Sequence, residues 1–339
     1  MTNPGDPRSR AVLARLRGVR KTYGDTTVLD LPELDIYAGQ VLGVVGENGA
    51  GKSTLMGALA GSVHRDAGGE IQLGGHALPP GAPQESQRLG VALVSQEFPL
   101  VSQLSVAENV LLGRRPRASK RRVLTDRRAM IAESQTLLTD IGLPPGTVKA
   151  GQKVKTVPVP TRQLIEIAKA WGRHPKLLIL DEPTSSLGPV EAELVLNLAR
   201  RHAADGGAVL FIGHRLDEVR EISDRIIVLR NGRLVADFSR EQATEAKLIN
   251  AMVGVEVISA DPIPYGGGDQ VLSVSGLTAD GLGPVDLRVG AGEIVGIAGL
   301  MGSGRSRLVH TIAGAQPSTG GRMTVSAGPY HPRSPSDGA

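Results

Sequence analysis

Short apolar runs, each followed by a polar or glycine-rich stretch, recur through the first two thirds of the chain. We interpret four of them as buried strands: Val41–Val45, Val91–Val94, Lys176–Leu180 and Ala208–Ile212. Segments with apolar residues at helical spacing lie between and after these strands: Ser53–Ala60, Gln163–Trp171, Val190–Ala204 and Leu216–Ile222. Strands that alternate with helices predict an α/β fold with a mostly parallel sheet, in which ligands bind beyond the carboxyl ends of the strands.

Alternation of apolar and polar residues predicts further strands around this core. We expect them at Ala11–Val19, Leu31–Ile36, Gly69–Leu73, Arg225–Arg230 and Leu234–Asp237. A turn is expected at Lys21–Asp25, between the first two. Asn231 and Gly232, between the last two, are the residue pair typical of a tight β-hairpin turn.

The pattern becomes helical at about residues 102–160, which predicts a helical insert in the α/β core. Ser105 and Glu108 have the spacing of a capping box that begins a helix. A second helix is expected over Asp126–Ile141. The segment between these helices, Arg114–Arg122, is basic, and we favour a solvated surface loop there over a contact with phosphate or anionic lipid.

The opening pattern of the chain returns after a segment rich in proline and glycine. Gly299 and Gly304 repeat the spacing of Gly46 and Gly51, and Val271–Leu277 repeats the character of the first strand. The repeat is of domain size. We therefore expect a first domain at 1–255, a linker at 256–270, and the N-terminal part of a second, truncated domain at 271–339.

The stretch from Gly46 to Thr54 carries the clearest chemistry, because its glycines, lysine and serine have the spacing and the strand–helix context of a phosphate-binding loop. Its members are Gly46, Glu47, Asn48, Gly49, Ala50, Gly51, Lys52, Ser53 and Thr54. Backbone N–H groups and the helix N-terminus would line a hollow for an anion. Lys52 would reach the terminal phosphates, and the Ser53 hydroxyl would ligate Mg²⁺. The alternative is a Gly-rich turn with a solvated lysine.

Polar side chains also follow three other predicted strands. Asp181 comes after an apolar strand, the usual setting for a carboxylate that holds Mg²⁺ beside a phosphate loop. Glu182 could orient or deprotonate an attacking water. Gln96 could contact the metal or that water, and His214 could hydrogen-bond the terminal phosphate. Away from a phosphate loop, each would be read as a solvated residue at a strand end.

Composition narrows the class of protein. The 339 residues are 40% hydrophobic and 21% charged, as in ordinary globular proteins. There is no cysteine, which excludes disulfides and thiolate metal sites. A net charge of +4 permits binding to nucleic acid, but an aromatic content of 2% argues against base stacking. We expect neither a signal peptide nor a membrane-spanning segment.

Together these residues resemble the nucleotide-binding subunits of ATP-binding cassette (ABC) transporters, and most closely the double-cassette ATPases of bacterial carbohydrate importers of the ribose, galactose and xylose type. The resemblance rests on Gly46–Leu55, Leu104–Gly113, Asp126–Met130, Gln163–Ala170, Leu180–Thr184, Gly299–Ser306 and Arg333–Gly338. It implies an α/β P-loop NTPase cassette with a mostly parallel sheet, flanking helices, an antiparallel β subdomain and the helical insert, followed by an incomplete second cassette.

The resemblance also implies roles for the candidate residues. According to the resemblance, Tyr23 would stack on adenine and Gly46–Thr54 would bind the phosphates. The ligands of Mg²⁺ would be Ser53, Gln96 and Asp181. Glu182 would act on the attacking water, and His214 would contact the γ-phosphate. The cofactors would be ATP and Mg²⁺. The implied function is ATP hydrolysis that drives carbohydrate import, on the cytoplasmic face of the membrane. Its partners would be integral-membrane permease subunits, a second cassette and, indirectly, a sugar-binding protein, with no nucleic acid.

Several positions depart from the family pattern. Where relatives carry a Leu-Ser-Gly-Gly-Gln-like signature, this chain has Val157–Thr161, and Pro160 lacks a backbone N–H. Gly188 and Gly213 replace a usual aspartate and serine. Arg305 replaces the second phosphate-loop lysine. These departures keep a rival function open, a regulatory subunit that binds ATP with little turnover. A second rival is an ABC ATPase that acts on nucleic acid or ribosomes.

Overall fold

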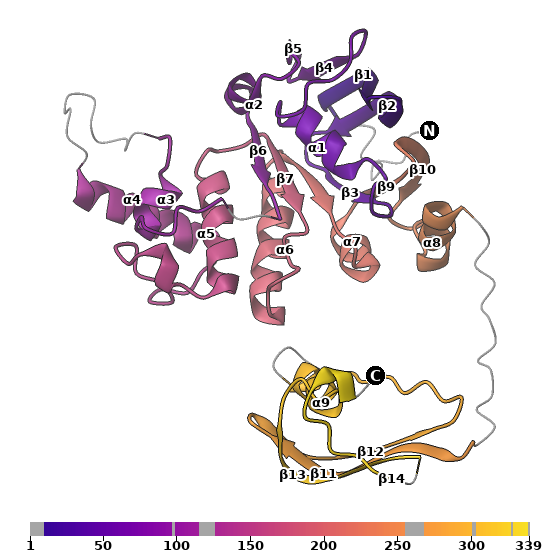
Figure 1. Cartoon of the computed structure of the whole chain (residues 1–339). Coiled ribbons are helices and arrows are strands. Elements are labelled where there is room, and N and C mark those ends of the chain that lie inside the picture. Colours follow the sequence, from indigo (N-terminus) through magenta and orange to yellow (C-terminus); the bar gives the residue numbers. More distant parts are fainter. Residues whose placement is uncertain are drawn as a thin grey trace. The chain divides into compact units, whose positions relative to one another are not determined.

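The computed structural model describes residues 10–96, 99–114, 126–254, 268–299, 303–326 and 328–337. The chain divides by its internal contacts into two compact units, Met1–Val257 and Ile258–Ala339, each described here by itself (Figure 1). Most of the expected linker at 256–270 lies outside the described residues, as does the basic loop from Arg115 onward. No helix of the described residues is long and apolar enough to cross a bilayer.

A six-stranded sheet forms the centre of the first unit's described residues. In spatial order its strands are β10 (Arg233–Ser239), β9 (Arg225–Arg230), β3 (Val41–Val45), β8 (Ala208–Ile212), β7 (Leu177–Asp181) and β6 (Val91–Val94). The strands from β9 to β6 run parallel, and β10 is antiparallel at the edge. The polar ends of β3, β6, β7 and β8 therefore meet along one edge of the sheet, as the sequence predicts.

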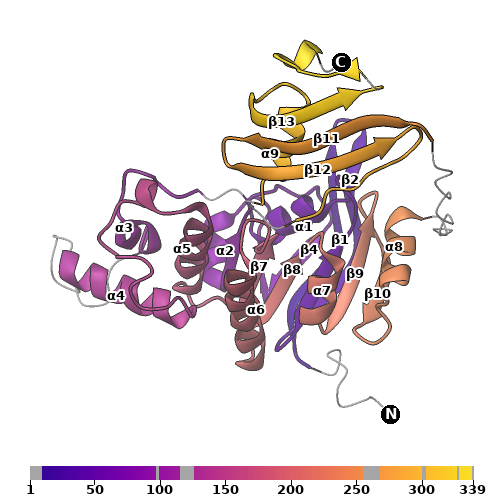
Figure 2. The same ribbon diagram turned by 90° about the horizontal axis from the view of Figure 1, so that it is seen from below.

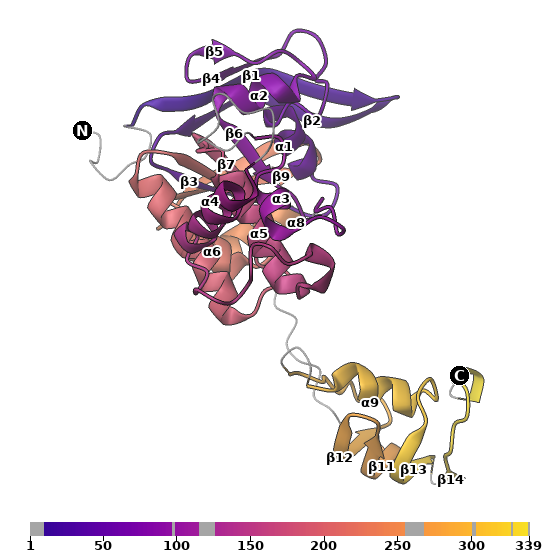
Figure 3. The same cartoon turned by 90° about the vertical axis from the view of Figure 1, so that its left-hand side faces the viewer.

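The two faces of the sheet bury alternate residues of each strand, because side chains alternate across a strand. On β3, Val41 and Val45 pack into one core with the helices, whereas Leu42 and Val44 pack into a second core with the antiparallel strands. Figure 3 shows the resulting three layers. The helices on the first face are α5 (Val159–Trp171), α6 (Pro189–Ala204), α7 (Leu216–Ile222) and α8 (Glu245–Val253).

An antiparallel sheet covers the other face. Its order is β2 (Thr26–Tyr37), β1 (Val12–Tyr23), β4 (Glu70–Leu73) and β5 (His76–Ala77), with α1 (Lys52–Leu59) and α2 (Pro83–Leu89) beside it. The expected turn at Lys21–Asp25 is wrong in extent, since β1 continues through Tyr23, which pairs with Thr26. Gly24, at φ 56°, supplies the left-handed turn, and the β-branched and aromatic residues on either side favour the strand.

The helical insert contains α3 (Val106–Val110) and α4 (Arg127–Asp140), which pack against α5 on its outer side (Figures 1 and 2). The predicted capping box is confirmed: Ser105 Oγ accepts from the N–H of Glu108, whose carboxylate accepts from the N–H of Ser105. Asp126 caps α4 as a single acceptor, since its Oδ1 accepts from the N–H groups of Arg128 and Ala129. Helix α5 begins four residues before the expected Gln163, because Pro160 is well suited to a first helical turn.

The second unit repeats the strand order of the antiparallel sheet of the first. Its sheet runs β12 (Leu282–Gly290), β11 (Gln270–Ala279), β13 (Ser318–Val325) and β14 (Gly328–Pro329), packed against α9 (Arg305–Ile312). The small core holds Val274, Leu277, Leu308 and Met323. The equivalent of β3 does not form, since residues 293–299 have no regular structure and Ile294 is 97% exposed.

Candidate functional site

The phosphate loop turns sharply between β3 and α1. Gly51 caps α1 in a left-handed conformation at φ 100°, and no side chain caps the helix, so its first N–H groups have neither an intrahelical acceptor nor a capping side chain. A Cβ on Gly46 would lie 2.3 Å from the carbonyl oxygen of Leu229, and one on Gly51 would lie 2.7 Å from that of Val28. Both positions therefore require glycine, which is the arrangement needed to bring backbone donors around an anion.

Lys52 folds back over this loop. Its Nζ donates to the carbonyl oxygens of Gly46 at 2.6 Å and Glu47 at 2.9 Å. Burial lowers the pKa of Lys52, and the nearby carboxylates of Glu182 and Asp181 oppose that shift. The ammonium thus lies in a half-buried position between the loop and two carboxylates, where a phosphate would strengthen its charged form.

Glu182 is the centre of the polar cluster at the sheet edge. Its Oε2 lies 3.2 Å from His214 Nδ1 and accepts a hydrogen bond from Gln96 Nε2, also at 3.2 Å. Glu182 has a left-handed φ of 46°, unusual for a residue with a side chain, and its N–H donates to Ile212 O at 2.9 Å. Side chains from the ends of β6, β7 and β8 therefore converge on one carboxylate.

Asp181 lies beside this cluster as the last residue of β7. Burial raises the pKa of Asp181 most, the neighbouring Glu182 raises it further, and Lys52 and the backbone of Gln96 oppose both. Two adjacent carboxylates held in a half-buried place repel each other, so a cation between them and a phosphate would be favoured. Magnesium prefers such oxygen donors, and the residues present fit it.

Tyr23 is the last residue of β1 and is 56% exposed. The ammonium of Lys21 lies 4.6 Å from the centre of its ring. An exposed ring at the end of a rigid hairpin offers a flat apolar face for a base, and its role as an adenine platform remains a prediction.

The repeated loop of the second unit matches the first only in part. Gly304 caps α9 in a left-handed conformation at φ 90°, as Gly51 caps α1, and both helices are eight residues long. Arg305 takes the place of Lys52 and is exposed. The strand that should precede the loop is not formed, and residues 300–302 lie outside the described residues.

The segment Val157–Thr161 is largely the first turn of α5, although the helix is expected to begin only at Gln163. Pro158 is the N-cap residue, Val157 is buried, and Val159 is half exposed. The N–H of Arg162 already donates to Pro158 O. Because Pro160 has no N–H, only Val159 and Thr161 can offer first-turn donors, which supports the idea that this signature position is weakened.

Three buried polar residues near the site were missed by the reasoning from sequence. Gln163 Nε2 donates to Pro183 O at 2.5 Å, and its Oε1 accepts from Ser186 Oγ at 2.6 Å. Thr184, in the same loop, donates a hydrogen bond from its Oγ1 to Glu218 Oε2. The available signal was weak, since Gln163 and Glu218 are polar residues on helix faces that otherwise bury apolar side chains.

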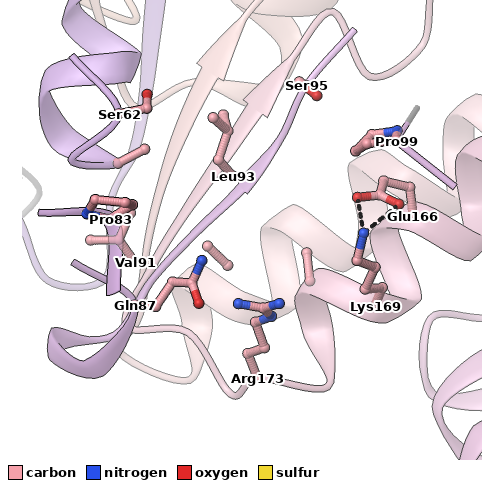
Figure 4. Close-up of a pocket in the computed structure, with 13 residues that line it drawn as sticks. Ser62, Pro83, Gln87, Val91, Leu93, Ser95, Pro99, Glu166, Lys169 and Arg173 are labelled. Atoms are coloured by element: carbon pink, nitrogen blue, oxygen red, sulfur yellow. Dashed lines mark hydrogen bonds and ion pairs between the residues drawn. The ribbon is translucent and has the colours of Figure 1, made fainter. Parts of the chain in front are cut away.

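A pocket of about 290 Å³ lies between β6 and α5 (Figure 4). Its walls include Gln87, Leu93 and Ser95 on one side and the ion-paired Glu166 and Lys169 on the other, 3.0 Å apart. No residue of the phosphate loop lines it, so this pocket is separate from the proposed nucleotide site.

A glycine-dependent phosphate loop with its lysine, at the carboxyl edge of a parallel sheet beside two carboxylates, defines a P-loop nucleotide-binding domain. Within the first unit, residues 29–185 match the family model described as "ABC transporter".

Relatives of known annotation extend the match over most of the chain. Ribose import ATP-binding protein RbsA 3 of Rubrobacter xylanophilus is 41% identical over 327 residues, which cover 96% of this chain and 65% of that protein. Ribose import ATP-binding protein RbsA 2 of Streptomyces coelicolor is 39% identical over 95% of this chain and 61% of its own length. The chain therefore spans somewhat less than two thirds of these relatives.

Solved structures support the fold. A nucleotide-free ATP-binding cassette from an ABC transporter has a TM-score of 0.61 and 22% identity, covering 71% of this chain and 98% of that one. A dimeric cassette solved in a post-hydrolysis state with ADP and Pi has a TM-score of 0.58 and 23% identity, covering 67% and 98%. Both matches agree with an α/β ABC cassette.

Proposed function

We propose that this protein is an ATP-binding, ATP-hydrolysing subunit that energises carbohydrate import through a separate membrane permease. The observation that carries the proposal is the convergence of Lys52, Asp181 and Glu182 at the phosphate loop, with His214 at 3.2 Å from Glu182. The carbohydrate class rests on the similarity to ribose import ATP-binding proteins.

Binding would use the whole phosphate loop. Backbone N–H groups from Gly46 to Thr54 and the ammonium of Lys52 would hold the phosphates, while the ring of Tyr23 would pack on the base. Ser53, Gln96 and Asp181 offer a hydroxyl, an amide oxygen and a carboxylate for Mg²⁺. Since Gln96 Nε2 donates to Glu182, its Oε1 is the atom suited to a metal or to water.

Bound Mg²⁺ supplies charge neutralisation at the phosphates. Glu182 would accept a proton from, or orient, the attacking water, because its carboxylate projects into the same cluster as Lys52. His214 would hydrogen-bond the γ-phosphate and, through the contact of its Nδ1 with Glu182, hold that carboxylate in place. These roles for individual residues are proposals that the geometry supports.

We further propose partners of three kinds. A second ABC cassette would face the phosphate loop and complete the site, as the dimeric cassette among the structural matches suggests. Integral-membrane permease subunits would contact the helical insert around α3 and α4. A sugar-binding protein would act indirectly, through the permease. The protein would then work in the cytoplasm, peripheral to the inner face of the cell membrane.

The rival functions have less support. The relatives are import ATP-binding proteins by name, which does not favour a nucleic-acid or ribosome-associated ATPase. One observation favours a regulatory subunit with little turnover: the proline in the first turn of α5 removes a backbone donor from the signature position. Measured turnover in the presence of the permease separates it from the proposed function.

Transport by the reconstituted complex tests the proposal. Proteoliposomes that hold the permease, with this protein, an intact second cassette and ATP inside and the sugar-binding protein outside, should take up a labelled pentose or hexose only when Mg²⁺ is present. Lys52→Ala should abolish uptake by loss of binding, and Glu182→Gln should abolish it while ATP still binds. Uptake that continues in both variants, or that needs no ATP, would refute the proposed function.

A further inference from the structure

Two loops carry the residues to which the proposed function assigns the chemistry. Glu182 begins the loop after β7, and His214 lies in the loop after β8. Their side chains meet at 3.2 Å, but both are reachable by solvent at that point, and His214 is more than half exposed. An exposed pair of this kind contributes little to holding two loops together.

A second connection, made through one buried carboxylate, joins the same two loops; its Thr184 partner is buried and its Arg215 partner is 52% exposed. Thr184 lies two residues after Glu182, and its Oγ1 donates to Glu218 Oε2 at 2.5 Å. Arg215 follows His214 directly, and its guanidinium pairs with Glu218 Oε1 at 2.6 Å. Thr184 is 6% exposed and Glu218 is 9% exposed. Each oxygen of one buried carboxylate is therefore held by a different loop.

We infer that Glu218 is a positioning residue that holds Glu182 and His214 as one unit. The inference rests on the proposed function, because it concerns the residues assigned to hydrolysis there. Glu218 does not touch the proposed nucleotide site and acts through Thr184 and Arg215. The Glu218 oxygen that Thr184 holds would be left unsatisfied in a buried place, so the loop after β7 resists movement away from it. The ion pair with the half-exposed Arg215 adds a weaker restraint on the loop after β8. Glu182 also needs restraint, since its φ of 46° is a sparsely populated conformation.

Thr184→Val removes the hydroxyl at nearly constant volume and cuts the connection on the Glu182 side, while Thr184→Ser keeps it. Glu218→Gln weakens the connection on the Arg215 side. The matched control is Glu221→Gln, on the same helix α7, because Glu221 is an exposed carboxylate paired with Arg200 at 2.5 Å. All four variants are made in the full chain.

Two measurements on these variants decide the matter. Amide hydrogen exchange followed by mass spectrometry should show faster exchange in Thr184→Val in both loops, including the residues around His214, which the substitution does not touch. Single-turnover ATP hydrolysis should slow by roughly 10–100-fold in Thr184→Val and Glu218→Gln, with Mg-ATP affinity unchanged. Thr184→Ser and Glu221→Gln should match the wild type in both measurements. The double variant that combines Thr184→Val with Glu218→Gln should hydrolyse ATP no more slowly than either single variant.

Faster exchange confined to the loop of Thr184, or wild-type hydrolysis in Thr184→Val, would overturn the inference and leave the proposed function standing. Failure of the proposed function has a different signature: Lys52→Ala would bind Mg-ATP as tightly as the wild type. The exchange measurement still tests the connection between the loops in that case, because it needs no turnover.

Discussion

At the scale of single residues, the two halves of the repeat carry different cationic side chains at one equivalent position. Lys52 and Arg305 are both the first residue of an eight-residue helix that a left-handed glycine caps. Lys52 lies among carboxylates and loop carbonyls, whereas Arg305 is exposed. The compact ammonium fits a narrow hollow, whereas the broad guanidinium fork of an arginine does not replace it.

Lys52→Ala should therefore weaken Mg-ATP binding by roughly 10–100-fold, the usual worth of a charge-assisted hydrogen bond. Arg305→Ala should leave the affinity nearly unchanged, because the loop at 299–306 lacks its preceding strand. Isothermal titration calorimetry of both variants measures the two affinities. Equal losses would mean that the second loop also binds nucleotide and that our assignment to the first unit is wrong.

Asp181 gives a pH-dependent prediction. Burial and Glu182 raise its pKa in the fold, so the folded state binds this proton more tightly than the unfolded state does. That contribution to stability is fully present below the unfolded pKa and is lost as the pH rises through the folded pKa. Ionised Asp181 therefore destabilises the nucleotide-free fold at neutral pH.

Asp181→Asn should raise the Tm of the nucleotide-free protein at pH 7 by about 1–3 °C, a modest value because the group is partly solvated. The gain should disappear below the ordinary aspartate pKa of 3.8. With Mg-ATP bound, the Tm of Asp181→Asn should instead be lower than that of the wild type, because the variant loses a proposed ligand of the metal. Differential scanning calorimetry across this pH range checks the sign, and a lower Tm at pH 7 in the variant would contradict it.

At the scale of elements, the hairpin of β9 and β10 connects the phosphate loop to β2. Asn231 and Gly232 both have positive φ, at 49° and 75°, as a type I′ turn requires. The N–H of Gly232 donates to Ala50 O at 3.1 Å, and its carbonyl accepts from the N–H of Asp30 at 2.7 Å. One turn thus supports the loop that is proposed to hold the phosphates.

Gly232→Ala should disturb this support, because a Cβ there would lie 2.7 Å from Val28 O. Gly206→Ala is the matched control: its φ of 88° is also left-handed, but nothing lies within 4 Å of the added Cβ. The control should cost about 1 kcal/mol in the free energy of unfolding, and Gly232→Ala at least about 1 kcal/mol more. Urea denaturation measures both free energies of unfolding. Similar losses of stability in the two variants would show that an added Cβ at Gly232 does not clash with β2.

The elements also show what the sequence could predict. The buried strands β3, β6, β7 and β8 were identified from short apolar runs, and their polar ends lie along one sheet edge as predicted. The residue at which an element begins is harder to predict. Helix α5 begins at Val159, four residues before the predicted start at Gln163, because a proline suits a first turn. The contacts of Gln163 and Glu218 depend on which loops the fold brings to them, which no local pattern encodes.

At the scale of the whole molecule, the two units differ in how much apolar surface they bury. The first has two cores that share the faces of a central sheet. In the described part of the second unit, the core has four buried residues, one antiparallel sheet and the α-helix α9, and Ile294 is almost fully exposed. A single small core of this kind gives little net stability.

Limited proteolysis should therefore cut first near Gly266–Gly268, in a sequence rich in proline and glycine, and then digest the C-terminal piece. The N-terminal piece should persist, because its α/β core is complete. Mass spectrometry of a time course identifies the fragments. A compact C-terminal fragment that survives as long as the N-terminal one would show that the second unit is stable by itself.

The last prediction concerns turnover. In the dimeric arrangement that we propose, each nucleotide lies between the phosphate loop of one cassette and the signature segment of the other. This chain has Val157–Thr161 at the signature position, where Pro158 and Pro160 both lack a backbone N–H. Losing one set of positioned donors commonly slows phosphoryl transfer by about 10²–10³. Two copies of the chain would not restore it, since each brings the same segment.

The purified chain should thus bind Mg-ATP but hydrolyse it slowly, and an intact second cassette added in trans should raise the rate. Glu182→Gln should then abolish the gain while binding persists, because the rate increase would still pass through the carboxylate beside His214. Steady-state phosphate release, with and without the added cassette, measures the effect. Brisk hydrolysis by the chain alone, lost in Glu182→Gln, would show that the first turn of α5 works as a signature despite Pro160.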